Sequence, residues 1–198
     1  MPDLDASTAT ETDSAARAAA PVGASATDPT GLERAESLIA VIPDYPSPGI
    51  LFRDITPMLA DGDAFRAAID AVIAPFAGTF DVVAGIEARG FIVASAAAIA
   101  AGCGVVPIRK AGKLPRPAAS VDYALEYATA TIEIHDDIAP GTRVLLLDDV
   151  LATGGTIAAA RTLVHEIGAE VTGVGVLIEL EALGGRAVAG DVHSLWTV

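Results

Sequence analysis

One run of the sequence constrains the fold more than any other: Val-Leu-Leu-Leu-Asp-Asp-Val-Leu-Ala-Thr-Gly-Gly-Thr at 144–156. Its four large apolar residues predict a strand buried on both faces, as in a parallel sheet, with Asp148 and Asp149 where the strand emerges. A helical apolar pattern follows Thr156 and ends at Gly168, a usual place for the glycine that follows a helix. The run therefore predicts a strand, a glycine-rich turn and a helix in succession.

The same turn is typical of an anion-binding site. Glycines let backbone N–H groups approach a phosphate closely, and the start of a helix adds roughly 0.3 to 1 kcal/mol per negative charge. Unlike a GxxxxGK[ST] loop, this turn has no lysine, and two carboxylates precede it. We expect those carboxylates to face ribose hydroxyls or a divalent cation rather than phosphate. A glycine-rich turn of an unrelated doubly wound protein is the plainer alternative.

The run at 144–156 resembles the phosphoribosyl pyrophosphate motif of the type I phosphoribosyltransferases. Two more segments narrow the resemblance to the adenine phosphoribosyltransferases of that family. Residues 46–57 are similar to their adenine-site loop, and Ala-Leu-Glu-Tyr at 124–127 resembles their acid followed by a tyrosine. The resemblance runs from about Tyr45 to about Glu179 and implies an α/β fold with a doubly wound parallel sheet, a small hood and a flexible lid loop.

The resemblance implies a pentosyltransferase of purine salvage that converts adenine and phosphoribosyl pyrophosphate to AMP and pyrophosphate. It also implies Mg²⁺, a cytoplasmic location and a homodimer. A transferase for another base, a 6-oxopurine or orotate, stays open as a second enzyme. A non-catalytic regulator that senses phosphoribosyl pyrophosphate is the alternative from another class, and the first 29 residues offer no folded DNA-binding segment for it.

The implied substrate-binding residues divide by the part of the substrate that they would hold. The ribose and its 5′-phosphate would be held by Asp148, Asp149, Ala152, Thr153, Gly154, Gly155 and Thr156. Pyrophosphate would lie against the catalytic Arg89, where another strand end meets a helix start, and would be neutralised as it leaves. The cations Arg109, Lys110 and Lys113 would lie beside it, partly across a dimer interface. Mg²⁺ would arrive with the substrate, near Asp148 and Asp149.

The base would be held by the loop around Phe52. Its ring would stack on adenine while backbone groups of Leu51 and Arg53 read the edge of the base. Adenine offers N1 as acceptor and N6 as donor, and a 6-oxopurine reverses both, so a fixed backbone pair rejects the wrong base. The resemblance makes Glu126 the catalytic acid/base that exchanges a purine proton. Without it, Phe52 reads as a core aromatic and Glu126 as a solvated carboxylate.

Composition limits the partners. The 198 residues are 52% hydrophobic, enough for one well-filled α/β domain, and a net charge of −14 argues against a nucleic-acid partner. Positive charge is instead local, because the only two lysines lie between Arg109 and Arg116. No apolar stretch is long enough to cross a bilayer, so we expect no membrane partner. The single cysteine, Cys103, favours a reducing compartment.

The chain divides into a tail and one domain. Residues 1–29 have few large apolar side chains, so we expect a disordered, acidic, low-complexity tail, followed by a single domain at 30–198. The remaining patterns predict helices at 30–42, 63–76 and 90–101, a Pro/Gly loop at 43–57, and strands at 81–86, 104–108, 129–135 and 171–178. Because strands and helices alternate, ligands are expected at the carboxyl ends of the strands.

Overall fold

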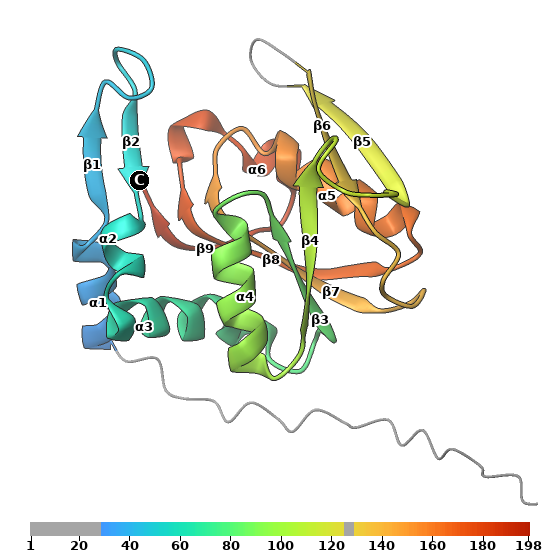
Figure 1. Ribbon diagram of the computed structural model, residues 1–198. Helices are drawn as coiled ribbons and strands as arrows, with labels where there is room; N and C mark the ends of the chain where they lie inside the picture. The colour runs from blue at the N-terminus through green and yellow to red at the C-terminus, as the bar shows by residue number, and fades with distance from the viewer. Residues whose placement is uncertain (1–28, 125–128) are drawn as a thin grey trace, which may run out of the picture.

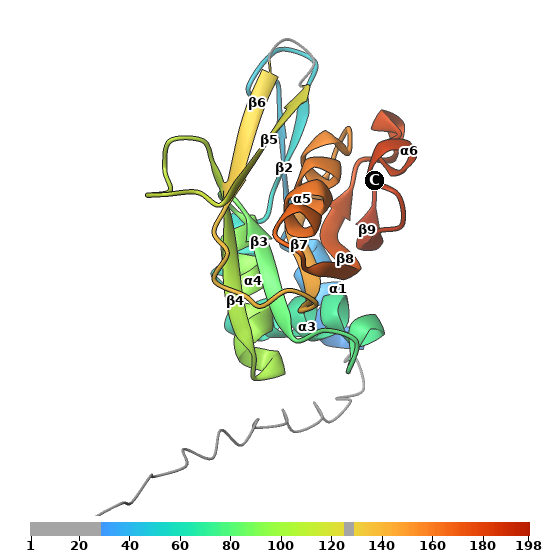
Figure 2. The ribbon, with the colours of Figure 1, turned by 90° about the vertical axis from the view of Figure 1, so that its right-hand side faces the viewer.

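The computed structural model describes residues 29–124 and 129–198, which form a central sheet with helices on both faces (Figures 1 and 2). The sheet has the strand order β5-β6-β4-β3-β7-β8-β9. Its strands are β3 (Val82–Ile86), β4 (Gly104–Lys110), β5 (Ala119–Ala124), β6 (Thr129–Ile134), β7 (Arg143–Leu151), β8 (Glu170–Glu179) and β9 (His193–Thr197). The α-helices are α1 (Pro29–Ser37), α2 (Thr56–Leu59), α3 (Gly62–Ile73), α4 (Gly90–Ala101), α5 (Gly155–Glu166) and α6 (Arg186–Ala189).

The five strands from β4 to β9 in this order run parallel, which confirms the doubly wound α/β prediction. The hairpin of β5 and β6 extends the sheet antiparallel at the β4 edge, so the complete sheet is mixed. A second hairpin, β1 (Ala40–Pro43) with β2 (Leu51–Asp54), stands apart as a two-stranded sheet and forms the hood. Both hairpins project beyond the carboxyl ends of the parallel strands (Figure 1).

The apolar run of β7 is buried on both faces, as its sequence predicts. Val144 and Leu146 belong to the core cluster that includes α5, whereas Leu145 and Leu147 pack with α3 and α4. All four have no exposed surface. A fully buried side chain of this size contributes about 1.5 to 3 kcal/mol, so this strand is a principal source of stability.

The predicted segments agree with the structure except in the hood. The predicted helix at 30–42 is wrong beyond Ser37, because Val41 and Ile42 form strand β1. Both are β-branched and they precede Pro43, which disfavours the helical backbone before it. The predicted loop at 43–57 is wrong over β2, which gains its extended form by pairing with β1.

Two expectations concern the ends of the fold. Of the predicted tail at 1–29, residues 1–28 lie outside the described residues, whereas Pro29 is the first residue of α1, one residue before the predicted start of the domain. Within 29–124 and 129–198, no helix has the length and apolar character needed to cross a membrane.

Candidate active site

Two adjacent carboxylates lie near the carboxyl end of β7. Oδ2 of Asp149 is 2.8 Å from Nε of Arg89, and Oδ1 of Asp148 accepts the backbone N–H of Asp149 at 2.9 Å. Burial raises the pKa of Asp148, as does the nearby charge of Asp149. Burial also raises the pKa of Asp149, against the opposing effect of Arg89. The sequence placed these residues at a strand end, and the structure adds Arg89 as the cation between them and the hood.

Arg89 joins the acidic pair to the hood. Its guanidinium carbon lies 5.1 Å from the ring centroid of Phe52 in β2, a cation–π distance. Tyr45 packs edge-on against the same ring, with centroids 5.1 Å apart. Phe52 is therefore not an ordinary core aromatic. It faces Arg89 near the carboxyl ends of the parallel strands, where its ring can stack on a flat ligand.

The start of α4 packs closely against β7 at Asp148. A Cβ on Gly90, the first residue of α4, would lie 2.7 Å from Oδ1 of Asp148 and 3.0 Å from the carbonyl oxygen of Leu147. Only a residue without a side chain lets α4 start this close to β7. The loop that carries Arg89 is thereby held against the two carboxylates.

The cationic loop after β4 gathers around a carboxylate that the sequence analysis left without a role. Glu87 accepts the backbone N–H of Lys110 at 3.0 Å, pairs with the ammonium of Lys113, and lies 3.4 Å from Nε of Arg109. Burial opposes ionisation of Glu87, but hydrogen bonds from Lys113 and Lys110 outweigh it and leave the pKa lowered. The signal that could have revealed Glu87 is its place directly after the apolar strand, two residues before Arg89.

The glycine-rich loop has the form expected for anion binding. Gly154 has φ of +85°, a conformation that favours glycine, and α5 begins at the next residue. Gly154 is the N-cap residue and no side chain caps the helix, so the first N–H groups of this twelve-residue helix stay available at its start. Residues 152–156 can therefore cradle a phosphate with backbone donors.

Not every predicted site residue lies within the described part of the chain. Glu126 lies in the segment 125–128, outside the described residues. Leu51 and Arg53 flank Phe52 in β2, and the Leu51 residue is 56% exposed. Phe52, Arg89 and the acidic pair are thus brought together, and the loop at 152–156 follows β7 directly.

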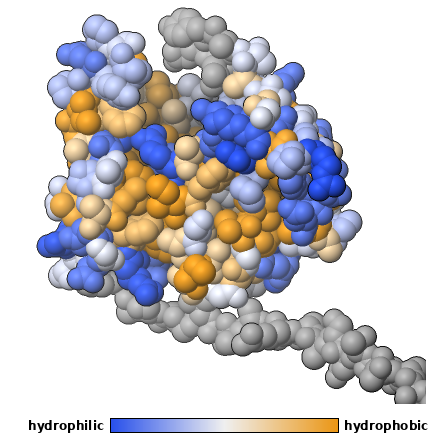
Figure 3. Space-filling model, in the orientation of Figure 1, coloured by the Kyte–Doolittle hydropathy of each residue, from blue (hydrophilic) through white to orange (hydrophobic). Residues whose placement is uncertain are grey.

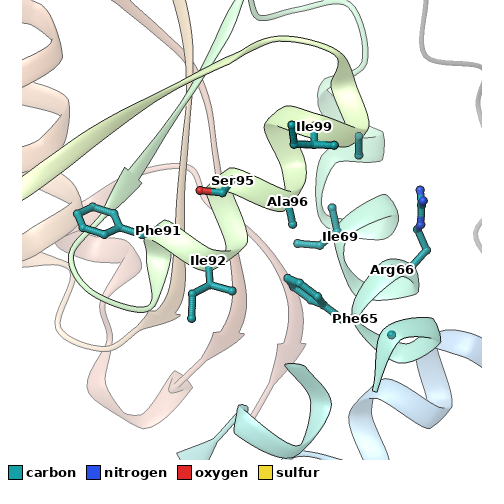
Figure 4. A pocket seen from close by; sticks show the side chains of 10 residues that line it. Phe65, Arg66, Ile69, Phe91, Ile92, Ser95, Ala96 and Ile99 are labelled. Carbon is teal, nitrogen blue, oxygen red and sulfur yellow. The ribbon is translucent and has the colours of Figure 1, made fainter. Parts of the chain in front are cut away.

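A separate apolar hollow of about 850 Å³ lies between α3 and α4. Figure 4 shows Phe65 and Ile69 of α3 facing Ile92 and Ala96 of α4. Apolar side chains also gather on the face of the molecule that carries α4 (Figure 3). The hollow contains none of the predicted site residues, so it is a surface feature distinct from the acidic pair.

The chain is similar to known phosphoribosyltransferases. Residues 56–194 match the phosphoribosyl transferase domain family. An adenine phosphoribosyltransferase of Renibacterium salmoninarum is 58% identical over 166 residues, covering 82% of this chain and 91% of that protein. A crystal structure of the enzyme of that name from Thermoanaerobacter pseudethanolicus has a TM-score of 0.81 at 44% identity, covering 84% of this chain and 99% of the other. The corresponding structure from Saccharomyces cerevisiae, solved with adenine and an imino-altritol bisphosphate, has a TM-score of 0.77 at 34% identity, covering 83% and 97%.

Proposed function

Because the chain belongs to the adenine phosphoribosyltransferases, within the phosphoribosyl transferase domain family, we propose that it transfers the phosphoribosyl group of phosphoribosyl pyrophosphate to adenine. N9 of adenine bonds to C1′ of the ribose as the bond from C1′ to pyrophosphate breaks, and AMP and pyrophosphate are the products. The observation that carries this proposal is the series of contacts from Phe52 through Arg89 to Asp149. It joins a ring for the base, a cation for pyrophosphate and a carboxylate for the ribose.

The sugar phosphate is assigned to β7 and the loop after it. Asp148 and Asp149 accept hydrogen bonds from the ribose hydroxyls, and residues 152–156 donate backbone N–H groups to the 5′-phosphate. Hydrogen bonds to charged groups contribute about 1.5 to 3 kcal/mol each, so these are the principal anchors. The buried surroundings of Asp149, which is 5% exposed, support an interaction little weakened by water.

Pyrophosphate is assigned to the cations on the other side of C1′. Arg89, Arg109, Lys110 and Lys113 would stabilise the negative charge that develops as the leaving group departs. Arg89 is paired with Asp149 and Lys113 with Glu87. These ion pairs hold the two cationic side chains in defined positions. Pyrophosphate would compete with the two carboxylates for them.

Mg²⁺ fits this site as an ion brought by the substrate. Within the described residues, no group of three or more His, Cys, Asp or Glu side chains could hold a metal. Mg²⁺ is commonly held by one or two carboxylates together with substrate phosphates and water. Asp148 and Asp149 would lie beside it, and when bound it would neutralise charge on the pyrophosphate.

Adenine selectivity is assigned to strand β2. Within the described residues, β2 pairs with β1 alone, so its other edge offers backbone donors and acceptors in alternation. Leu51 and Arg53 would read N1 and N6 of the base from this edge while Phe52 stacks on its face. An assay of base consumption tests the proposal: adenine is consumed, whereas hypoxanthine, guanine and orotate are not. Consumption of another base in preference to adenine would contradict it.

Glu126 is assigned the transfer of a proton from the imidazole ring of the purine. Glu126→Gln keeps the size of the side chain and removes the titratable proton, so kcat is expected to fall roughly 10²-fold or more. The affinity for adenine should change less, because the amide can still hydrogen-bond. A single-turnover rate equal to that of the parent protein would remove Glu126 from the reaction.

We also propose a cytoplasmic homodimer. The face around α4 exposes large apolar side chains, since Ile99 is 84%, Ile92 45% and Val105 44% exposed. Apolar surface of this kind is typical of a subunit interface. Because α4 starts beside Arg89, a second copy on this face would lie next to the pyrophosphate-binding residues. The cytoplasmic location is supported by the chain's single cysteine, Cys103, which cannot form an internal disulfide.

A further inference from the structure

A short turn late in the chain lies directly behind the glycine-rich loop. A Cβ on Gly185 would come within 2.2 Å of the carbonyl oxygen of Ala152, and a Cβ on Gly154 would come within 2.2 Å of the carbonyl oxygen of Gly185. Gly185 immediately precedes α6, which lies beside α5 in Figure 2. The two backbones are in such close contact that neither glycine leaves room for a side chain. A displacement of the α6 turn would therefore displace residues 152–154.

Arg186 fastens this turn to the sheet. Its Nε donates to Oε1 of Glu179 over 2.7 Å, and its Nη2 donates to the other carboxylate oxygen. Nη1 donates to the backbone carbonyl of Val192. Ser194 completes the network, because its hydroxyl donates to Oε2 of Glu179 at 2.9 Å and accepts from Arg186 at 3.1 Å. A two-point contact of this kind fixes the orientation of the guanidinium as well as its distance.

The carboxylate that receives Arg186 belongs to the strand next to the loop. Glu179 is 5% exposed and is aligned with Leu151, the residue that precedes the loop, in the pairing of β8 with β7. Hydrogen bonds from Arg186 lower the pKa of Glu179 in spite of its burial. A buried carboxylate so fully bonded is a rigid anchor for the α6 turn.

We infer that Arg186 and Glu179 are positioning residues for the glycine-rich loop at 152–156, the phosphate loop of the proposed function. Their ion pair holds the α6 turn against residues 152–154, so the loop keeps the arrangement in which its N–H groups meet the 5′-phosphate. Neither residue needs to touch the substrate. The inference rests on the proposed function and adds to it a support for one defined part of the ligand, the phosphate and not the base.

The test compares AMP with adenosine, which differ in the 5′-phosphate. Dissociation constants for both are measured by calorimetry or by competition, with the parent protein and with Arg186→Gln. We expect AMP to bind roughly tenfold more weakly to the variant, at the low end of the range for groups that orient metal ligands. Adenosine should bind equally to both proteins. Arg186→Lys keeps the charge without the fork and should recover part of the loss.

Arg143→Gln is the matched control. It breaks a different arginine–carboxylate ion pair, Arg143–Asp81, at the opposite end of β7, and it should leave the AMP-to-adenosine ratio unchanged. An Arg186→Gln protein that keeps the parent ratio would overturn the inference. If that variant does not fold, Ser194→Ala decides by the same ratio. A parent protein that neither consumes adenine nor prefers AMP to adenosine would instead overturn the proposed function.

Discussion

At the residue scale, the two adjacent aspartates differ in what offsets their charge. Asp149 has Nε of Arg89 at 2.8 Å, whereas Asp148 accepts the backbone N–H of Asp149. Because the pKa of Asp148 is raised in the fold, folding favours its protonated form. Its contribution to stability is complete below the unfolded-state pKa and is lost as the pH rises through the folded-state pKa. Asp148 therefore increasingly destabilises the folded protein as the pH rises from acid towards neutral.

Asp148→Asn should accordingly raise the Tm at about pH 7.5, and the gain should shrink towards about pH 4, where the parent aspartate is protonated. Thermal denaturation across this pH range measures the difference. The same variant should bind phosphoribosyl pyrophosphate more weakly, since a neutral amide lacks the charge that the site uses. Asp149→Asn is the comparison, and its gain in Tm should be smaller, because Arg89 loses its carboxylate partner in that variant. An Asp148→Asn gain of equal size at both pH values would contradict the assignment.

At the scale of elements, the contact of α4 with the sheet depends on glycine. A Cβ on Gly85 in β3 would lie 2.6 Å from Cβ of Ala94 and 2.8 Å from the carbonyl oxygen of Gly90. Gly85→Ala should therefore lower the free energy of unfolding by about 1 to 3 kcal/mol, the usual effect of overpacking. Urea denaturation measures it. Gly62→Ala, where a Cβ meets nothing within 4 Å, is the control and should not destabilise the protein. Equal losses in both variants would show that the packing of α4 is not the cause.

Local sequence patterns predicted the elements whose conformation depends little on distant residues. The β7 strand, the loop at 152–156 and α4 could be predicted because burial on both faces and glycine placement are visible in a short window. The pairing of β1 with β2 could not, since a β-branched run before Pro43 gains its strand form only from a partner about ten residues away. The contact of Gly185 with the loop at 152–156 could not be predicted for the same reason. It joins segments that are adjacent only in the folded sheet.

At the scale of the whole molecule, the predicted tail should be dispensable for the fold. Residues 1–28 contain few large apolar side chains, so their removal should expose little buried surface. A chain that starts at Pro29 keeps α1, including the fully buried Ala35. We expect its Tm and adenine turnover to equal those of the full chain. A decrease of many degrees in the Tm would mean that the tail docks on the domain.

The exposed apolar face of α4 gives the last prediction, on assembly. Ile99 is 84% exposed, and a charge at this position would have to be desolvated if a second copy covered it. If this face forms the proposed homodimer, Ile99→Asp should therefore give a monomer, while the Tm of the isolated fold stays nearly the same. Light scattering after size-exclusion chromatography measures the mass, with Val198→Asp, an exposed apolar residue at the C-terminus, as the control that stays dimeric. If the copies meet at the pyrophosphate side, the Ile99 variant should also lose phosphoribosyl pyrophosphate affinity. A parent protein that elutes as a monomer, or an Ile99 variant that remains dimeric, would place the interface elsewhere or remove it.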